Sequence, residues 1–171
     1  MPQQAIREAI DNVARAIAAN PEKGLVKNSP ATASLTKDLT FSITGPKGEK
    51  AQTDMPTALG GGNGVPQPGW LMRASLAACT GTVIAMRAAQ VGIALDKLDV
   101  TVESQGDNRG MLGLDDSVSA ALIGLRAIVH IRAAKVSADE IRSLVRWGDD
   151  HSPIACTLRH ALGADIEVVV E

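Results

Sequence analysis

The feature that most constrains the fold is one long helix whose middle carries small side chains. The pattern from about Pro68 to Val91 predicts this helix, and Gly92 supplies the residue that ends it. Residues 74–82 consist almost entirely of alanine, serine, cysteine, threonine and glycine. The whole chain is 45% hydrophobic but only 2% aromatic, so its core has to be built from aliphatic and small side chains. Such a core lets helices approach one another closely.

The remaining patterns predict strands and helices that do not alternate strictly along the chain. Helical spacing and capping residues predict helices, and apolar alternation between turn residues predicts strands. The expected helices cover residues 3–19, 137–147 and 153–162, and the expected strands cover residues 31–35, 39–44, 50–55, 95–104, 119–133 and 166–170. This order is typical of an α+β fold rather than of a doubly wound α/β fold. The length of 171 residues fits one domain.

Charge and composition exclude several classes of function. The net charge of −2 gives no basic surface for nucleic acid or for an anionic membrane. The three aromatic residues are too few for a platform on which bases stack. No run of about 18 apolar residues predicts a transmembrane helix, and the N-terminus resembles neither a signal nor a transit peptide. Two cysteines are too few for a secreted disulfide scaffold, so we expect a cytoplasmic protein.

The two cysteines, Cys79 and Cys156, are the candidate chemical groups. Cys156 lies about one turn after Ser152, which is the predicted N-cap of the last helix, and local rules favour ionisation of its thiol. Cys79 lies roughly 16 Å from the start of its own helix, beyond the reach of that helix dipole. A packing role is open for both thiols. Cys156 and the histidines around it match no standard zinc spacing, and we expect no metal or other cofactor.

Three stretches of the sequence, taken together, resemble one known family. The first is LMRASLAACT at residues 71–80, which follows a proline-containing loop. The second is GIALDKLDVTVE at residues 92–103, followed by DNRG at residues 107–110. The third is Ser-Pro-Ile at residues 152–154, at the start of a predicted helix. In order and spacing these stretches are similar to the OsmC/Ohr family of osmotically induced and organic hydroperoxide resistance proteins, over about residues 30–170.

The resemblance implies a fold, an assembly and an activity. The fold would be an OsmC-like domain over residues 22–171 with an N-terminal helical extension at residues 1–21, intertwined with a second copy in a homodimer. The activity would be that of a thiol peroxidase, with a hydroperoxide as substrate and a dithiol as reductant. Cys79 matches the cysteine that attacks the peroxide. Cys156, or an external thiol, would then resolve the oxidised sulfur, and Arg73 or a nearby lysine would supply positive charge.

The sequence departs from the family pattern at three places. The family's acidic residue at the entry to the long helix falls near Gly69 and Trp70, and no glutamate lies between Glu49 and Glu103. Ser152 occupies the position before the proline where the peroxidase members have their resolving cysteine. No arginine lies between Arg15 and Arg73, where the family has a thiolate-stabilising arginine. Two further hypotheses therefore stand beside the peroxidase. One is a non-enzymatic dimer that binds a small apolar or thiol-reactive ligand, and the other is a stable dimer whose cysteines only pack.

Overall fold

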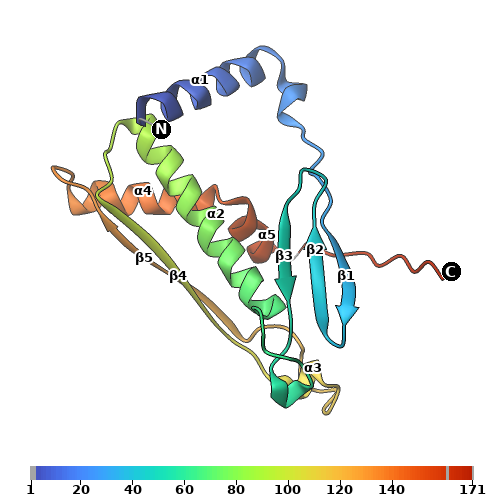
Figure 1. Cartoon of the computed structure of the whole chain (residues 1–171). Coiled ribbons are helices and arrows are strands. Elements are labelled where there is room, and N and C mark those ends of the chain that lie inside the picture. The colour runs from blue at the N-terminus through green and yellow to red at the C-terminus, as the bar shows by residue number, and fades with distance from the viewer. Residues whose placement is uncertain (1–2, 161, 171) are drawn as a thin grey trace. The chain divides into compact units, whose positions relative to one another are not determined.

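The computed structural model describes residues 3–160 and 162–170 and confirms the α+β class. Figure 1 shows the course of the chain. The elements are, in order, α1 (Gln3–Ala19), η1 (Pro21–Gly24), β1 (Thr32–Lys37), β2 (Thr40–Thr44), β3 (Lys50–Thr53), η2 (Thr57–Leu59), α2 (Pro68–Val91), β4 (Lys97–Gln105), α3 (Asn108–Met111), β5 (Gly124–Arg132), α4 (Ala138–Asp150) and α5 (Pro153–His160). Gly92 has φ +75° directly after α2, which confirms the predicted end of the long helix.

The chain forms two compact units, and residues 11–74 make up one of them. Its sheet has the antiparallel order β1-β2-β3, with Ser42 of β2 opposite Ser34 on one side and Gln52 on the other. The glycine-rich loop that follows is folded around the buried carboxylate of Asp54. This carboxylate accepts hydrogen bonds from the backbone N–H groups of Met55 at 2.7 Å and Gly62 at 2.9 Å. The loop therefore has a defined conformation in the described structure.

The other unit comprises residues 1–10 and 75–171 and contains both cysteines. Its antiparallel ladder runs from Lys97 opposite Arg132 to Gln105 opposite Gly124. Helices α2 and α4 lie on one face of this two-stranded sheet (Figure 1). The core between them consists of Ile84, Ala88 and Leu144, with Leu98, Val129 and Ile131 of the strands packed against it. The alternating apolar face predicted for the long strand is thus the face that meets the helices.

Helix α4 begins and approaches α2 for reasons visible in the sequence. Ser137 and Glu140 form the predicted capping box: Glu140 N–H donates to the Ser137 hydroxyl, and the Ser137 N–H donates to the Glu140 carboxylate. Gly148 lies where a side chain would overlap Ile84 of α2. Because Gly148 has no Cβ, the backbone of α4 at this position can pack directly against the Ile84 side chain of α2.

Two of the predicted strands are wrong in part or in full. The strand expected over residues 119–133 begins only at Gly124, because its partner β4 ends at Gln105 and leaves the preceding residues without a ladder. The strand expected at residues 166–170 does not form, and its side chains are exposed, as Ile166 (89%) and Val170 (90%) illustrate. Alternation predicts which residues can pair, but a strand also needs a neighbour whose backbone accepts its hydrogen bonds.

Candidate active site

Cys79 lies in the middle of α2 as a free, half-buried thiol. Its neighbours on the helix, Leu76 and Thr80, are buried, with 5% and 2% of their surface exposed. The small residues of this stretch place no charged side chain within one helical turn of the sulfur in the sequence. Any group that activates the thiol must therefore come from another element.

The serine at the start of α5 contacts the thiol from another element. The Ser152 hydroxyl donates a hydrogen bond to the Cys79 sulfur at 3.2 Å. The same oxygen accepts from the Thr80 hydroxyl at 3.4 Å and from the backbone N–H of Ala155 at 3.4 Å. A serine hydroxyl has one proton to donate and two lone pairs. With both lone pairs engaged, its proton is directed at the sulfur.

Ser152 is held in place by the sequence around the turn from α4 to α5. Its bond from the Ala155 N–H confirms it as the N-cap of α5, with Pro153 in the first helical position. The residue before it, His151, stacks on the Trp147 ring, with the ring centroids 3.9 Å apart. The guanidinium of Arg87 lies over the Trp147 ring, with its Cζ 4.6 Å from the centroid. These contacts join α2, α4 and the turn, and they fix the serine, which is fully buried.

This arrangement places a hydrogen-bond donor and a helix N-terminus at the Cys79 sulfur. A hydrogen bond to a charged acceptor is stronger than one to a neutral acceptor. The N-terminus of α5 begins beside the sulfur, and the positive end of a helix dipole stabilises an anion nearby. Because the thiolate is the nucleophilic form of cysteine, the geometry suits a reactive thiol. The local argument from sequence, which favoured Cys156 because of its position on α5, stays a prediction.

The Cys156 sulfur contacts a different partner. It donates to the backbone carbonyl of Asp150 at 3.2 Å, at the end of α4, and the thiol is free. Arg159, one turn along α5, forms an ion pair with Asp149 at 2.8 Å and also donates to the Asp149 carbonyl. The pKa of Arg159 is raised, first by its hydrogen bond to Asp149 and to a smaller extent by the negative charges of Asp149 and Asp150. The structure thus brings Cys79 together with Ser152, and Cys156 together with Asp150.

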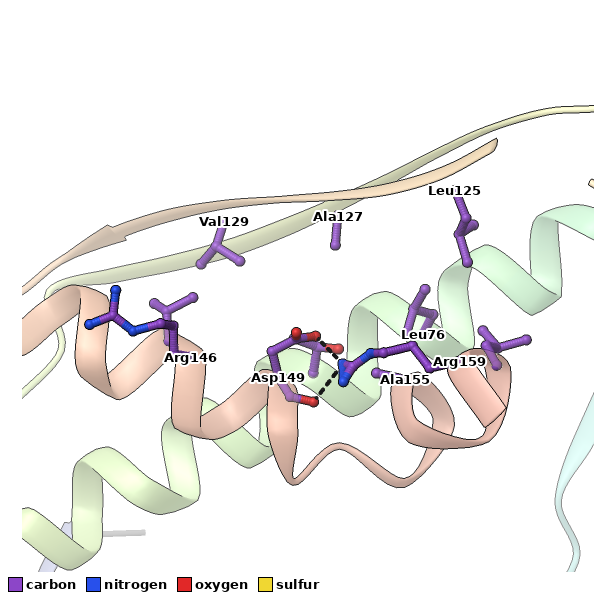
Figure 2. A pocket seen from close by; sticks show the side chains of 11 residues that line it. Leu76, Leu125, Ala127, Val129, Arg146, Asp149, Ala155 and Arg159 are labelled. Carbon is purple, nitrogen blue, oxygen red and sulfur yellow. Dashed lines mark hydrogen bonds and ion pairs between the residues drawn. The ribbon is translucent and has the colours of Figure 1, made fainter. Parts of the chain in front are cut away.

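A cavity of about 520 Å³ lies between the sheet and the helices of the same unit. In Figure 2 the side chains of Leu125, Ala127 and Val129 point from β5 toward the helices. Most of its walls are apolar, and Arg146 and the Asp149–Arg159 pair supply the charged groups. The full lining is Leu76, Thr80, Leu125, Ala127, Val129, Val145, Arg146, Asp149, Ala155, Leu158 and Arg159. Through Thr80 the cavity is joined to the hydroxyl network at Cys79.

The sequence predicted both thiols and the N-cap Ser152, but it did not predict the contact between Ser152 and Cys79. Thr80 and the contact of Ser152 with Cys79 depend on how α2 and α5 pack, and no local pattern encodes that packing. The role given to Arg73 stays a prediction. Among the residues that the structure describes, no group of three His, Cys, Asp or Glu side chains could hold a metal ion. Within residues 3–160 and 162–170, no helix combines the length and apolar character needed to cross a bilayer.

The fold and the site define a class: an α+β protein with a free thiol on a long helix, faced by the hydroxyl at the start of a second helix. Residues 60–167 match the family described as OsmC-like protein. This match covers more than half of the chain, so the protein belongs to the OsmC-like family, as the resemblance predicted. No curated protein matches the sequence.

Solved structures share this fold at low sequence identity. An organic hydroperoxide resistance protein OsmC from Legionella pneumophila is 21% identical, with a TM-score of 0.59 over 79% of this chain and 91% of that chain. An OsmC-like protein from Mycoplasma pneumoniae is 18% identical, with a TM-score of 0.67 over 79% and 89%. The organic hydroperoxide resistance protein OhrB of Bacillus subtilis is 18% identical, with a TM-score of 0.53 over 79% and 93%.

Proposed function

We propose that this protein reduces hydroperoxides with Cys79 as the attacking thiol, in defence against oxidative stress. The observation that carries the proposal is the hydrogen bond from the fully buried Ser152 hydroxyl to the Cys79 sulfur. Proteins named for organic hydroperoxide resistance share the fold, which agrees with this chemistry. The apolar cavity beside Thr80 offers room for the organic part of an alkyl hydroperoxide.

The first step consumes the hydroperoxide. The Cys79 thiolate attacks one oxygen of ROOH, so that a sulfur–oxygen bond forms and the oxygen–oxygen bond breaks. The leaving oxygen takes up a proton as ROH, and Cys79 becomes a sulfenic acid. A thiol, from Cys156 or from outside the chain, then condenses with the sulfenic acid to a disulfide and releases water. A dithiol reductant reduces this disulfide and regenerates the thiol.

We also propose that the protein acts in the cytoplasm as a homodimer. Its described surface carries many large apolar side chains, among them Leu114 (71%), Ile123 (66%) and Val168 (76%). Large exposed apolar surfaces are typical of association sites. A second copy would cover side chains that the single chain leaves in water.

The direct test is hydroperoxide consumption by the purified protein with dithiothreitol as reductant. We expect consumption of cumene hydroperoxide well above a protein-free blank. It should fall to the blank in Cys79→Ser. The matched control is Cys156→Ser, which retains the reactive thiol and should still form the sulfenic acid. Equal rates for the wild type and Cys79→Ser would rule out the proposed chemistry.

The cavity supports a second candidate function, the binding of a small apolar ligand without catalysis. Its mostly apolar walls, with the few charged side chains Arg146, Asp149 and Arg159, resemble the lining of ligand sites in general. This alternative predicts that Cys79→Ser binds an apolar fluorescent probe as tightly as the wild type does and that neither protein consumes hydroperoxide. Substitution of Leu125 by a charged residue at the cavity wall should then abolish probe binding.

A further inference from the structure

Ser152, rather than a thiol, faces the reactive sulfur, and this decides how oxidised Cys79 can be reduced. The sequence contains two cysteines, so Cys156 is the one thiol of the same chain that could form a disulfide with Cys79. The hydroxyl in contact with the Cys79 sulfur can donate a proton but cannot form a disulfide. The question is therefore whether Cys156 can replace Ser152 at that sulfur.

The contacts of Cys156 hold its side chain at a different place from Ser152. Its sulfur donates to the Asp150 carbonyl, and its backbone N–H donates to the Ser152 carbonyl at 2.9 Å as part of α5. Cys156 lies four residues beyond Ser152, which is about 6 Å along a helix axis. A disulfide requires a sulfur–sulfur distance of about 2 Å with closely placed Cα atoms. For the Cys156 sulfur to take the place of the Ser152 hydroxyl, α5 would have to slide by about one turn and lose the Ser152 cap.

The positions of Ser152 and Thr80 oppose such a movement. The Ser152 hydroxyl makes three hydrogen bonds, to Cys79, Thr80 and Ala155, and is completely buried. Displacing it would leave polar groups buried without partners, which costs free energy. Cys79, in contrast, is only half-buried in the single chain, which leaves part of the residue open to a small molecule.

We propose that oxidised Cys79 is resolved by an external low-molecular-weight thiol and that Ser152 commits the site to this one-cysteine chemistry. The proposal rests on the proposed function. The sulfenic acid of Cys79 condenses with the small thiol, so that a sulfur–sulfur bond forms and the sulfenic hydroxyl leaves as water. A second thiol, of the same dithiol reductant or of another small molecule, attacks this mixed disulfide and releases the Cys79 thiol. The two small thiols supply both electrons and leave joined as a disulfide.

The test separates resolution from peroxide chemistry by using diamide, an oxidant of thiols, together with reduced glutathione. The full chain is treated with both, and its intact mass and digest are measured. We expect wild type and Cys156→Ser alike to carry one glutathione on Cys79. Ser152→Cys, in which a thiol replaces the facing hydroxyl, should instead lose two hydrogens and form an internal bridge to Cys79.

Two results would overturn the inference. One is a loss of two hydrogens in the wild type that disappears in both Cys79→Ser and Cys156→Ser, because it would place Cys156 at the Cys79 sulfur. The other is a wild-type Cys79 that takes up no glutathione. A parallel sample receives cumene hydroperoxide in place of diamide. If only that sample fails to react, the proposed peroxidase function is wrong while the assignment of the external thiol stands.

The donor role of Ser152 has its own readout in the Cys156→Ser background, where Cys79 is the reporting thiol. We expect Ser152→Ala to slow alkylation of Cys79 by iodoacetamide at neutral pH by about tenfold, the size typical of a lost hydrogen bond to a charged group. The difference in alkylation rate between the two proteins should become smaller at high pH, where the thiolate forms without the hydrogen bond from Ser152. An equal rate in the two proteins at every pH would show that the hydroxyl does not stabilise the anion.

Discussion

The close approach of α4 to α2 yields a quantitative prediction, because it depends on the absence of one methyl group. Gly148 is buried, and a Cβ built there would overlap the Cγ1 of Ile84 and lie 3.1 Å from its Cα and 3.2 Å from its nitrogen. Carbon atoms in good contact are about 3.5–4.0 Å apart. Ile84 is fully buried, so its side chain has no free space into which to rotate. Gly148→Ala must therefore move the helices apart.

Two opposing terms set the size of the effect. Overpacking of a core costs about 1–3 kcal/mol, and contact with backbone as well as side chain places this site at the upper end. The change from glycine to alanine inside a helix returns about 1 kcal/mol. We therefore expect Gly148→Ala to lower the free energy of unfolding by about 2 kcal/mol. For a chain of this size that corresponds to a fall in Tm of about 4–8 °C.

Gly81→Ala is the matched control, since it adds the same methyl group inside a helix where space exists. A Cβ at Gly81 would meet Val100 at an ordinary contact distance of 3.4 Å, so the gain in helix propensity should dominate and stability should stay equal or rise. Urea unfolding followed by circular dichroism measures both variants. A Gly148→Ala protein as stable as Gly81→Ala would refute the packing argument. When Gly148→Ala is made in an Ile84→Ala background, it should lower the free energy of unfolding by less, because the Cγ1 atom that the new methyl group overlaps is absent.

Two further predictions concern the N-terminus of α4 and the C-terminal segment. The hydrogen bond from the Ser137 hydroxyl, followed by the one from its backbone N–H, lowers the pKa of Glu140 below its ordinary value. Stabilisation by ionised Glu140 is thus complete above the ordinary carboxyl pKa of about 4.3 and is lost as the pH falls through the lowered value. Glu140→Gln should accordingly be less stable than the wild type at pH 7, and the two melting curves should converge in acid; a gap that persists in acid would contradict this origin. If a second copy covers the C-terminal segment, Val168→Lys should shift the protein toward monomer in sedimentation velocity while Glu167→Lys leaves it dimeric, and identical behaviour of the two variants would exclude the segment from the interface.

Local chemistry allowed much of the fold to be predicted. The stripe of α1, the capping box at Ser137, the Ser152–Pro153 helix start and the glycine after α2 all act within a few residues. Their outcome does not depend on distant parts of the chain. The strand at residues 166–170 fails for the opposite reason. Most of its residues are β-branched, as is typical of strands, but pairing requires a second backbone, and the described chain places none beside it.

By itself, the sequence determined the α+β class, most element boundaries and the identity of the two thiols, because periodicity, caps and composition are local properties. Only the tertiary structure decided which polar group each thiol contacts. Local rules ranked Cys156 above Cys79, since they weigh only a residue's own helix. The packing of α5 against α2 brings a buried hydroxyl and a helix N-terminus to the Cys79 sulfur. Contacts between residues 73 positions apart depend on the packing of the whole unit, which no short segment encodes.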